Sequence, residues 1–494
     1  MNNNVLFKNI LASFRRTVSY IFAVIRQLAK SIPNIFKRHI FIAIRIMILT
    51  VKRIVVFPLR WLKWCLLLFT PAMSEDTEIS YQSGSKPTGK TAWIISFTGV
   101  SNEPRVLRQA NALLDDGWTV VVLGYQGHSP TSEDWHFCRL PANSPAIRLQ
   151  IYISNFWRKI SEKLITLNFG AAWRRGIARL QHRNISHWRN ITNCAVKFAT
   201  DHPELKADAI MAHDFHTCEV GYALKKYFGA PMLVDCHEYA RGQYMHDQKW
   251  VRQTQPYVVG MHEYYLTRAD AVTTVSDGIA ELMNKEEKLK RPVHAIKSVP
   301  FYDRQSFRPV GSRIKVLYHG DVSEVRGLHK AIASMPLWRE EFDLIIRGAG
   351  DADYFENLKQ LAKNLGLSHR LFLEGPVPFD QIVPAANRAD IGYFVHYDAS
   401  PQKRFVLPNK FFEYVMAGLA LCVSDLPEMS RLVKSHDLGR LVAEFDEQEI
   451  ANVINSFDRV SIEEYKRASL EAAKELNWQK EKTKLLDDLK NVLY

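Results

Sequence analysis

The first 74 residues lack acidic side chains altogether, since the first one in the chain is Glu75. They also lack a long apolar run. The longest stretch without a charged residue, 64–74, has eleven residues, whereas a spanning helix needs about 20. A signal peptide fits poorly, because Arg26 ends the apolar run that follows Arg15 and Arg16 and no small-residue cleavage site comes after it. The pattern therefore argues against both a membrane span and a cleaved leader.

Cysteine is scarce as well. The six cysteines are scattered, with no CxxC pair and no spacing typical of zinc ligands. We expect reduced thiols, with Cys236 and Cys422 packed in the core because they stand in apolar runs of strand length. Glycine, proline and charged residues occur at ordinary levels, which excludes collagen-like, disordered and coiled-coil classes. A length of 494 residues indicates two or three domains.

What residues 1–74 do contain is positive charge. They hold 12 of the 65 Lys and Arg residues, which leaves 53 basic and 52 acidic residues for the rest of the chain. On a helix, the basic residues between Lys8 and Lys30 fall within an arc of about 100°. Residues 34–57 repeat this pattern between Pro33 and Pro58, and the aromatic Trp61 follows.

This pattern predicts amphipathic helices that lie in an anionic membrane surface, at the cytoplasmic face of the inner (plasma) membrane. The alternatives are a helical domain packed on the protein itself and, less favoured, a nucleic-acid-binding segment. The nearly neutral remainder of the chain argues against nucleic acid as a partner.

The remainder alternates short apolar runs with longer amphipathic stretches, which predicts an α/β protein with two doubly wound, Rossmann-like domains facing a cleft. We expect a linker at 75–90, an acceptor-side domain at 91–300, a second domain at 301–475 and a C-terminal helix at 476–494. The expected strands are 92–97, 119–125, 208–213, 232–235 and 271–275, then 315–318, 344–347, 371–373, 391–395, 420–424 and 440–443.

An insertion at 146–200 interrupts the first domain. It holds ten basic residues and one acid, Glu162, with aromatic residues between them. Two interpretations stay open for this stretch. It could be a further surface for membrane or for an anionic acceptor, or a solvated helical insertion with long basic side chains along its surface.

Two glycine loops follow strands in the second domain. Residues 318–321 (YHGD) end one strand and Arg326-Gly327 then opens a helix, while residues 348–351 (GAGD) follow the next strand. Such loops offer free backbone N–H groups to phosphate, and Arg326 adds a charge. Downstream, Pro408 is placed to start a helix in which Glu413 could accept two hydrogen bonds from a ribose diol.

The run LPNKFFEYVMAG (407–418), with YHG, RGL (326–328) and IIRGAGD (345–351) upstream, resembles the nucleotide-sugar-binding half of family-4 (group 1) retaining glycosyltransferases of the GT-B fold. In the first domain, RVLRQANALLDDGWTVVVL (105–123), AHDFH (212–216) and VDCHEY (234–239) resemble the opening unit and the strand-end histidine motifs of the same family. The resemblance covers about residues 91–475.

The resemblance implies roles at matching positions. Glu413 matches the glutamate that binds the donor ribose, and Arg326 stands where the family has a diphosphate-binding lysine. Asp321 stands where many members have a first diphosphate arginine, a role that Arg347 or Lys410 could take. Phe405 stands in place of the earlier glutamate of the family's paired motif, a loss shared by relatives with a PNK-type loop. The expected nucleotide-sugar site comprises Gly320, Arg326, Gly327, Arg347, Gly348, Gly350, Asn409, Lys410 and Glu413.

In the first domain, His213 resembles the family histidine near the reacting region of the sugar, although a histidine after an apolar strand is also often structural. The expected catalytic residues are His213, Arg326 and Glu413. The expected acceptor-side residues are Arg105, His213, Asp214, His237 and Glu238.

The resemblance implies transfer of a sugar, with retention, from a nucleotide diphosphate sugar and without a metal or other cofactor. With a membrane-lying tail, the expected acceptor is a lipid-linked or polysaccharide glycan, as in exopolysaccharide or lipopolysaccharide assembly. Two alternatives remain: a nucleotide-sugar epimerase or hydrolase of the same fold, and a catalytically silent scaffold on the membrane.

Overall fold

The computed structural model describes residues 80–85, 89–100, 103–126, 134–140, 188–286, 289–397 and 400–493, all within one compact unit, Ile79–Tyr494. The expected membrane-associating segment 1–74, residues 75–79 and 86–88 of the linker, and the insertion up to residue 187 lie outside the described residues. Of that insertion, the described part is helix α7 (Trp188–Asp201).

The first sheet has eight strands in the order β1-β4-β3-β2-β5-β6-β7-β8. All neighbouring pairs are parallel except β1 and β4. The strands are β1 (Ser80–Gln82), β2 (Thr91–Gly99), β3 (Thr119–Gln126), β4 (His136–Arg139), β5 (Ala209–His213), β6 (Met232–Cys236), β7 (Ala271–Thr274) and β8 (His294–Ala295).

The second sheet has six parallel strands in the order β11-β10-β9-β12-β13-β14. The strands are β9 (Ile314–His319), β10 (Phe342–Arg347), β11 (Leu371–Glu374), β12 (Ile391–Phe394), β13 (Ala420–Ser424) and β14 (Gly439–Val442). All eleven expected strands are present within one or two residues of their predicted bounds. The segment between β8 and β9 has no helix or strand.

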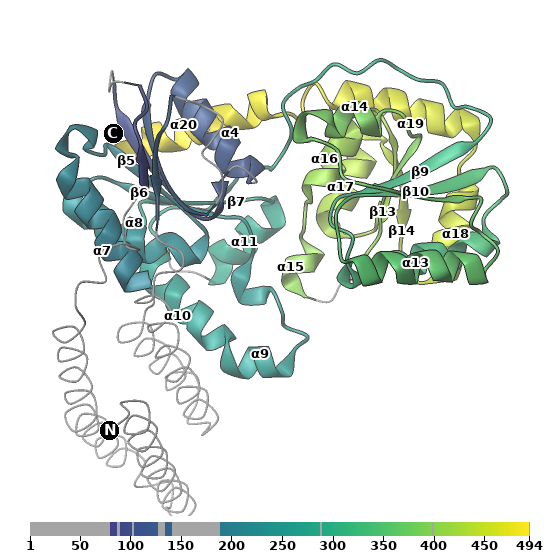
Figure 1. Cartoon of the computed structure of the whole chain (residues 1–494), viewed down its shortest axis with the longest axis horizontal. Coiled ribbons are helices and arrows are strands. Elements are labelled where there is room, and N and C mark those ends of the chain that lie inside the picture. The colour runs from purple at the N-terminus through teal and green to yellow at the C-terminus, as the bar shows by residue number, and fades with distance from the viewer. Residues whose placement is uncertain are drawn as a thin grey trace, which may run out of the picture. The chain divides into compact units, whose positions relative to one another are not determined.

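Helices cover both faces of each sheet (Figure 1). Around the first sheet they are α4 (Pro104–Asp115), α7, α8 (Asp214–Phe228), α9 (Gln248–Gln253), α10 (Gln255–Tyr265) and α11 (Asp277–Glu286). Around the second they are α12 (Leu328–Ser334), α13 (Ala352–Asn364), α14 (Ile382–Ala386), α15 (Pro401–Arg404), α16 (Asn409–Met416), α17 (Pro427–His436), α18 (Glu447–Ser456) and α19 (Arg459–Ala472).

Strands of the sheet centres are hydrophobic along their whole length because a parallel sheet is buried on both faces. β5 (AIMAH), β6 (MLVDC) and β13 (ALCVS) are buried at every position. Cys236 and Cys422 are buried in these strands, which confirms their predicted place in the core. The polar exceptions, His213 and Asp235, stand near the carboxyl ends of β5 and β6, at the edge where ligands of such sheets bind.

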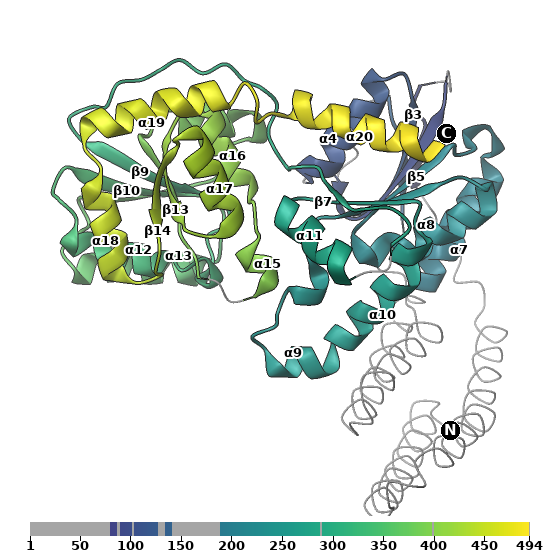
Figure 2. The same ribbon diagram turned by 180° about the vertical axis from the view of Figure 1, so that it is seen from behind.

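The predicted C-terminal helix is α20 (Trp478–Leu493), and it returns to the first sheet (Figure 2). It contacts α4, where the guanidinium of Arg108 lies 5.9 Å from the centre of the Trp478 ring. The backbone N–H of Trp478 donates to the carbonyl of Pro300 at 2.8 Å. The side chain of Glu481 accepts from the backbone N–H of Lys297 at 2.8 Å. This helix therefore ties the end of the chain to its first half.

Among the described residues, no helix has the length and apolar character that crossing a bilayer requires.

Candidate functional site

Three polar residues stand side by side at the carboxyl edge of the second sheet. In the strand register, Arg347 of β10 pairs with His319 of β9 on one side and with Glu374 of β11 on the other. Arg347 Nε donates to Glu374 at 2.7 Å, and its Nη1 is buried without a hydrogen-bond partner among the described residues. The neighbouring strand thus holds the Nε end of the Arg347 guanidinium.

The two glycine loops after β9 and β10 pack directly against each other. The Gly320 N–H donates to the Arg347 carbonyl at 2.9 Å, and the Val322 N–H donates to the Ala349 carbonyl at 2.8 Å. A Cβ atom on Gly348 would lie 1.7 Å from the Gly320 oxygen, and one on Gly350 would lie 2.0 Å from the Val322 oxygen. The glycines are therefore required first for loop-to-loop contact, and phosphate binding by these loops remains a prediction.

We expect Gly348→Ala to lower the free energy of unfolding by about 2–3 kcal/mol, since the new Cβ meets backbone that cannot rotate away. Urea unfolding followed by circular dichroism measures this. The matched control is Gly375→Ala, where no atom lies within 4 Å of the added Cβ and the change should stay within about 0.5 kcal/mol. Equal effects of the two substitutions would contradict the packing argument.

Arg326 lies at the entrance to α12, as the sequence predicts. Its Nε donates to Asp321 at 3.1 Å, both side chains being about half exposed. Burial raises the pKa of Asp321, but hydrogen bonds from Ser323 and Arg326 outweigh it and lower the pKa overall. Gly327 follows with φ of 67°, against the Phe445 ring. The guanidinium of Arg326 thus lies beside the first glycine loop, and the carboxylate of Asp321 partly compensates its positive charge.

Helix α16 brings Glu413 against the end of β9. Glu413 Oε2 lies 2.8 Å from His319 Nε2, and both side chains are largely buried. The ring of Tyr414 packs on the ring of His319 with 4.6 Å between their centres. The Tyr414 hydroxyl accepts a hydrogen bond from the backbone N–H of His319 at 3.1 Å. The sequence analysis gave no role to His319. Its position at the end of a strand, directly before a glycine, was the signal that could have identified it as a site residue.

Lys410 lies one turn before Glu413 and points toward the first glycine loop. A Cβ on Gly320, whose φ is 116°, would lie 3.1 Å from Lys410 Nζ. Nζ donates to the Tyr318 hydroxyl at 2.8 Å. Burial, helped by the charge of Arg326, lowers the pKa of Lys410 to about 7 although Glu413 and Asp321 oppose the shift. Asn409, also predicted in the site, begins the same helix.

In the first sheet, Asp235 is the centre of a buried polar cluster. His213, Asp235 and Thr273 are register partners on β5, β6 and β7. Asp235 accepts two hydrogen bonds from Arg105, at 2.6 and 2.7 Å, and one each from Gln109 and Thr273 at 2.7 Å. Burial raises the pKa of Asp235, but the charge and hydrogen bonds of Arg105 outweigh it and hold the pKa well below its usual range.

Arg105 is therefore engaged inside the first half. Besides Asp235 it donates to the Ile296 carbonyl at 2.7 Å, and only 2% of the residue is exposed. In the structure Arg105 holds Asp235 in position, and its place on the acceptor side stays a prediction.

His213 and His237 form a hydrogen-bonded pair above this cluster. His213 Nδ1 lies 2.9 Å from His237 Nε2, and Asp235 Oδ2 lies 3.6 and 3.5 Å from the same two nitrogens. Burial lowers the pKa of His213 to about 3. Burial also lowers that of His237, but Asp214 and Asp235 outweigh it and raise the pKa. His237 is therefore the more readily protonated of the two histidines.

This pairing engages one ring nitrogen of His213 and leaves the other for a ligand. His213 Nε2 is buried and has no hydrogen-bond partner among the described residues. Asp214 supports the pair, because its carboxylate accepts a hydrogen bond from the backbone N–H of His237 at 2.9 Å. The backbone of Asp214 itself has a φ of 62°, which is uncommon outside glycine. The predicted residues His213, Asp214 and His237 thus lie together, and Glu238 is exposed beside them.

His213, Asp235 and His237 could also be considered as metal ligands, since one ligand atom from each lies within 4.8 Å of the others. Both oxygens of Asp235 are already used by Arg105, Gln109 and Thr273. The geometry therefore fits a hydrogen-bonded cluster better than a metal site.

Phe405, in place of a glutamate, has a structural use. A Cβ on Gly278 would lie 2.2 Å from the Phe405 ring, and the Phe405 carbonyl accepts from Ser276 Oγ at 2.8 Å. Next to it, Glu428 of α17 accepts from the Gly278 N–H at 2.9 Å. Glu428 was not predicted; it faces the start of α11 from a part of the chain 150 residues away.

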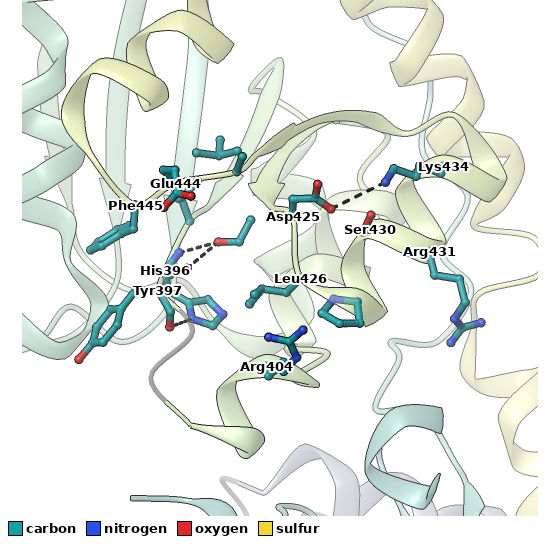
Figure 3. Close-up of a pocket in the computed structure, with 15 residues that line it drawn as sticks. His396, Tyr397, Arg404, Asp425, Leu426, Ser430, Arg431, Lys434, Glu444 and Phe445 are labelled. Atoms are coloured by element: carbon teal, nitrogen blue, oxygen red, sulfur yellow. Dashed lines mark hydrogen bonds and ion pairs between the residues drawn. The ribbon is translucent and has the colours of Figure 1, made fainter. Parts of the chain in front are cut away.

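A cavity of about 750 Å³ lies at the ends of β12, β13 and β14 (Figure 3). Its charged lining comprises Arg404, Asp425, Arg431, Lys434 and Glu444, and Lys434 Nζ lies 3.8 Å from Asp425. None of the predicted site residues lines this cavity.

Comparison with known proteins identifies both halves. Residues 102–296 match a family model described as a glycosyl transferase 4-like domain, and residues 313–457 match one described as glycosyl transferases group 1. No curated protein matches the chain.

Solved structures of glycosyltransferases share the fold. Sucrose-phosphate synthase from Thermosynechococcus elongatus has a TM-score of 0.60 at 15% identity over 82% of this chain and 99% of its own. Anabaena HepE in complex with UDP and glucose has a TM-score of 0.56 at 14% identity over 82% and 100%. The E. coli trehalose-6-phosphate protein bound with UDP-2-fluoro glucose has a TM-score of 0.55 at 11% identity over 81% and 98%. With more than half of its residues inside the two matched models, the chain belongs to the group 1 glycosyltransferases and is a glycosyltransferase of the GT-B fold.

Proposed function

We propose that this glycosyltransferase moves a sugar, with retention, from a nucleotide diphosphate sugar to a lipid-linked or polysaccharide acceptor at the cytoplasmic face of the membrane. The observation that carries the donor class is the pairing of Glu413 with His319, at 2.8 Å, beside the buried Lys410. Anabaena HepE and the E. coli trehalose-6-phosphate protein, whose fold this chain shares, are described with UDP or a UDP sugar bound.

In this proposal the second sheet binds the nucleotide. Glu413, which lies beside His319, accepts hydrogen bonds from the ribose hydroxyls. Lys410 lies against Gly320 and Arg326 contacts Asp321 in the first glycine loop, and both attract the diphosphate. The transition state is oxocarbenium-like, and the leaving diphosphate gains negative charge as the bond to the sugar breaks. These cations therefore stabilise the transition state more than the bound donor.

The first sheet handles the sugar and the acceptor. His213 offers Nε2, which has no hydrogen-bond partner among the described residues and suits a sugar hydroxyl. His237 holds the ring through the other ring nitrogen, and Asp214 supports His237. Glu238 directly follows His237, is exposed, and in this proposal offers its carboxylate to the acceptor. No metal is required in this scheme, because Lys410 and Arg326 supply the positive charge.

The test is incubation of the purified protein with a panel of nucleotide sugars and a membrane lipid extract. We expect release of a nucleoside diphosphate that depends on the extract, and a lipid whose mass increases by one sugar residue. The proton NMR spectrum of the product should show the anomeric configuration of the donor. Release that is independent of any acceptor would contradict transfer, and an inverted anomer would contradict retention.

The membrane part of the proposal rests on residues 1–74, which hold 12 basic and no acidic residues. Each such charge contributes about 1 kcal/mol of attraction to an anionic leaflet. A chain lacking these residues should move from the membrane to the soluble fraction, and a full-length chain with the 12 basic residues changed to glutamine should bind anionic vesicles more weakly. Unchanged fractionation of both variants would overturn the interfacial role.

A further inference from the structure

Lys410 is a buried cation with a mostly apolar environment. Its ammonium lies 4.0 Å from the centre of the Tyr318 ring and 5.1 Å from that of Phe394, and 9% of the residue is exposed. The Tyr318 hydroxyl is the single hydrogen-bond acceptor of Nζ among the described residues. That hydroxyl donates in turn to the Asp321 carbonyl at 2.6 Å.

The nearby acids are used elsewhere. Glu413, one turn further along α16, lies 2.8 Å from His319. Asp321 accepts from Ser323 at 2.6 Å and from Arg326 at 3.1 Å. Within the described part of the chain, no carboxylate lies within ion-pair distance of Lys410. A lone buried ammonium is unfavourable, because burial penalises the charged form without a counter-ion to offset it.

We propose that Lys410 takes up a proton from solvent when the diphosphate of the donor binds, so that nucleotide affinity is linked to the protonation of this one side chain. The inference rests on the proposed function, since the anion is the donor diphosphate. In this step one proton moves from the buffer to Nζ, and no covalent bond to the substrate forms or breaks. Release of the product returns the proton to the buffer.

The position of Nζ supports this step. It lies against the first glycine loop, where a Cβ on Gly320 would approach it to 3.1 Å. A diphosphate bound by that loop would be the counter-ion of Lys410, which has no carboxylate within ion-pair distance among the described residues. The groups facing Lys410 are Tyr318, Arg326, Asp321 and Glu413, and burial with Arg326 brings its pKa to about 7. A group with that pKa is about one quarter protonated at pH 7.5, so binding can add about three quarters of a proton.

The experiment is calorimetric titration of the full chain with UDP, GDP and ADP at pH 7.5, in HEPES and in Tris buffer. The difference in heat between buffers of different ionisation enthalpy gives the number of protons taken up. The terminal phosphate of the nucleotide itself titrates near pH 6, so the quantity to compare is wild type minus Lys410→Arg, in which the charge is fixed.

We expect wild type to take up about three quarters of a proton more than Lys410→Arg, and Lys410→Met to bind at least tenfold more weakly. Lys363→Arg, an exposed change on α13, is the matched control and should keep the wild-type uptake. Equal uptake by wild type and Lys410→Arg overturns the inference and leaves the proposed function standing. If none of the three nucleotides binds wild type, the proposed function fails, and the inference with it.

A second measurement covers the case in which Lys410→Arg does not fold. The affinity of wild type for the bound nucleotide should fall by up to about tenfold per pH unit above pH 7, because deprotonation of free Lys410 then competes with binding. An affinity that stays level between pH 7 and 8.5 overturns the inference.

Discussion

Replacing Glu413 by alanine is expected to lower kcat/KM for the nucleotide sugar by at least about 100-fold. The carboxylate would accept two hydrogen bonds from the ribose, and charged hydrogen bonds contribute about 1.5–3 kcal/mol each. A loss of about 2.7 kcal/mol corresponds to a hundredfold in rate. The substitution also leaves His319, now 2.8 Å from Glu413, without its partner.

Initial rates of nucleoside diphosphate release measure this effect. Glu413→Gln should lose less than Glu413→Ala, because the amide oxygen still accepts one hydrogen bond. Glu471→Ala is the control, a change in an exposed acid on α19 that pairs with Lys474. If Glu413→Ala transfers sugar as fast as Glu471→Ala, the assignment of the donor site is wrong.

Asp235→Ala is expected to cost about 3–5 kcal/mol of the free energy of unfolding, as is typical when one partner of a buried ion pair is removed. The side chains of Arg105 and Asp235 are 3% and 0% exposed, so the substitution leaves a guanidinium buried without its counter-ion. The variant also loses hydrogen bonds from Gln109 and Thr273. Urea unfolding of the full chain measures the loss.

Two variants sharpen this test. Arg105→Met combined with Asp235→Ala should recover part of the loss, because the guanidinium left without its counter-ion is then removed as well. Asp201→Ala removes the exposed partner of Lys197 and should cost less than about 1 kcal/mol. Similar losses in Asp235→Ala and Asp201→Ala would contradict the central place of Asp235.

The same ion pair predicts the response to acid. The pKa of Asp235 in the folded protein is well below its usual range, and in the unfolded chain it is about 3.9. Its contribution to stability is therefore complete above about pH 4 and is lost as the pH falls toward the folded-state pKa. Between pH 5 and pH 3, wild type should lose more stability than Asp235→Ala.

The positions of eleven strands along the chain could be predicted from their apolar runs, whereas the order of the strands within each sheet comes from the structure. β1, β4 and β8 were missed because they are short, two to four residues, and β1 and β8 lie at the edges of the sheet. A few residues at a sheet edge carry little periodic signal, and their pairing depends on partners far along the chain.

The candidate site could be predicted only as a set of residue types. The resemblance named Glu413, Lys410 and His213, but their partners come from contacts between distant positions. Asp235 meets Arg105 across 130 residues and Tyr318 meets Lys410 across 92. Gly348 illustrates the same limit: the sequence suggested a phosphate loop, and the structure gives it a packing role that no local pattern encodes.

The central claim is that the carboxyl edge of the second sheet binds the nucleotide of the donor. A crystal structure of the full chain with the nucleoside diphosphate that binds most tightly tests it most directly. The account predicts ribose hydroxyls within hydrogen-bond distance of Glu413, and the diphosphate against the first glycine loop between Lys410 and Arg326. A nucleotide seated instead in the cavity lined by Arg404, Arg431 and Lys434, with Glu413 touching His319 alone, would contradict it.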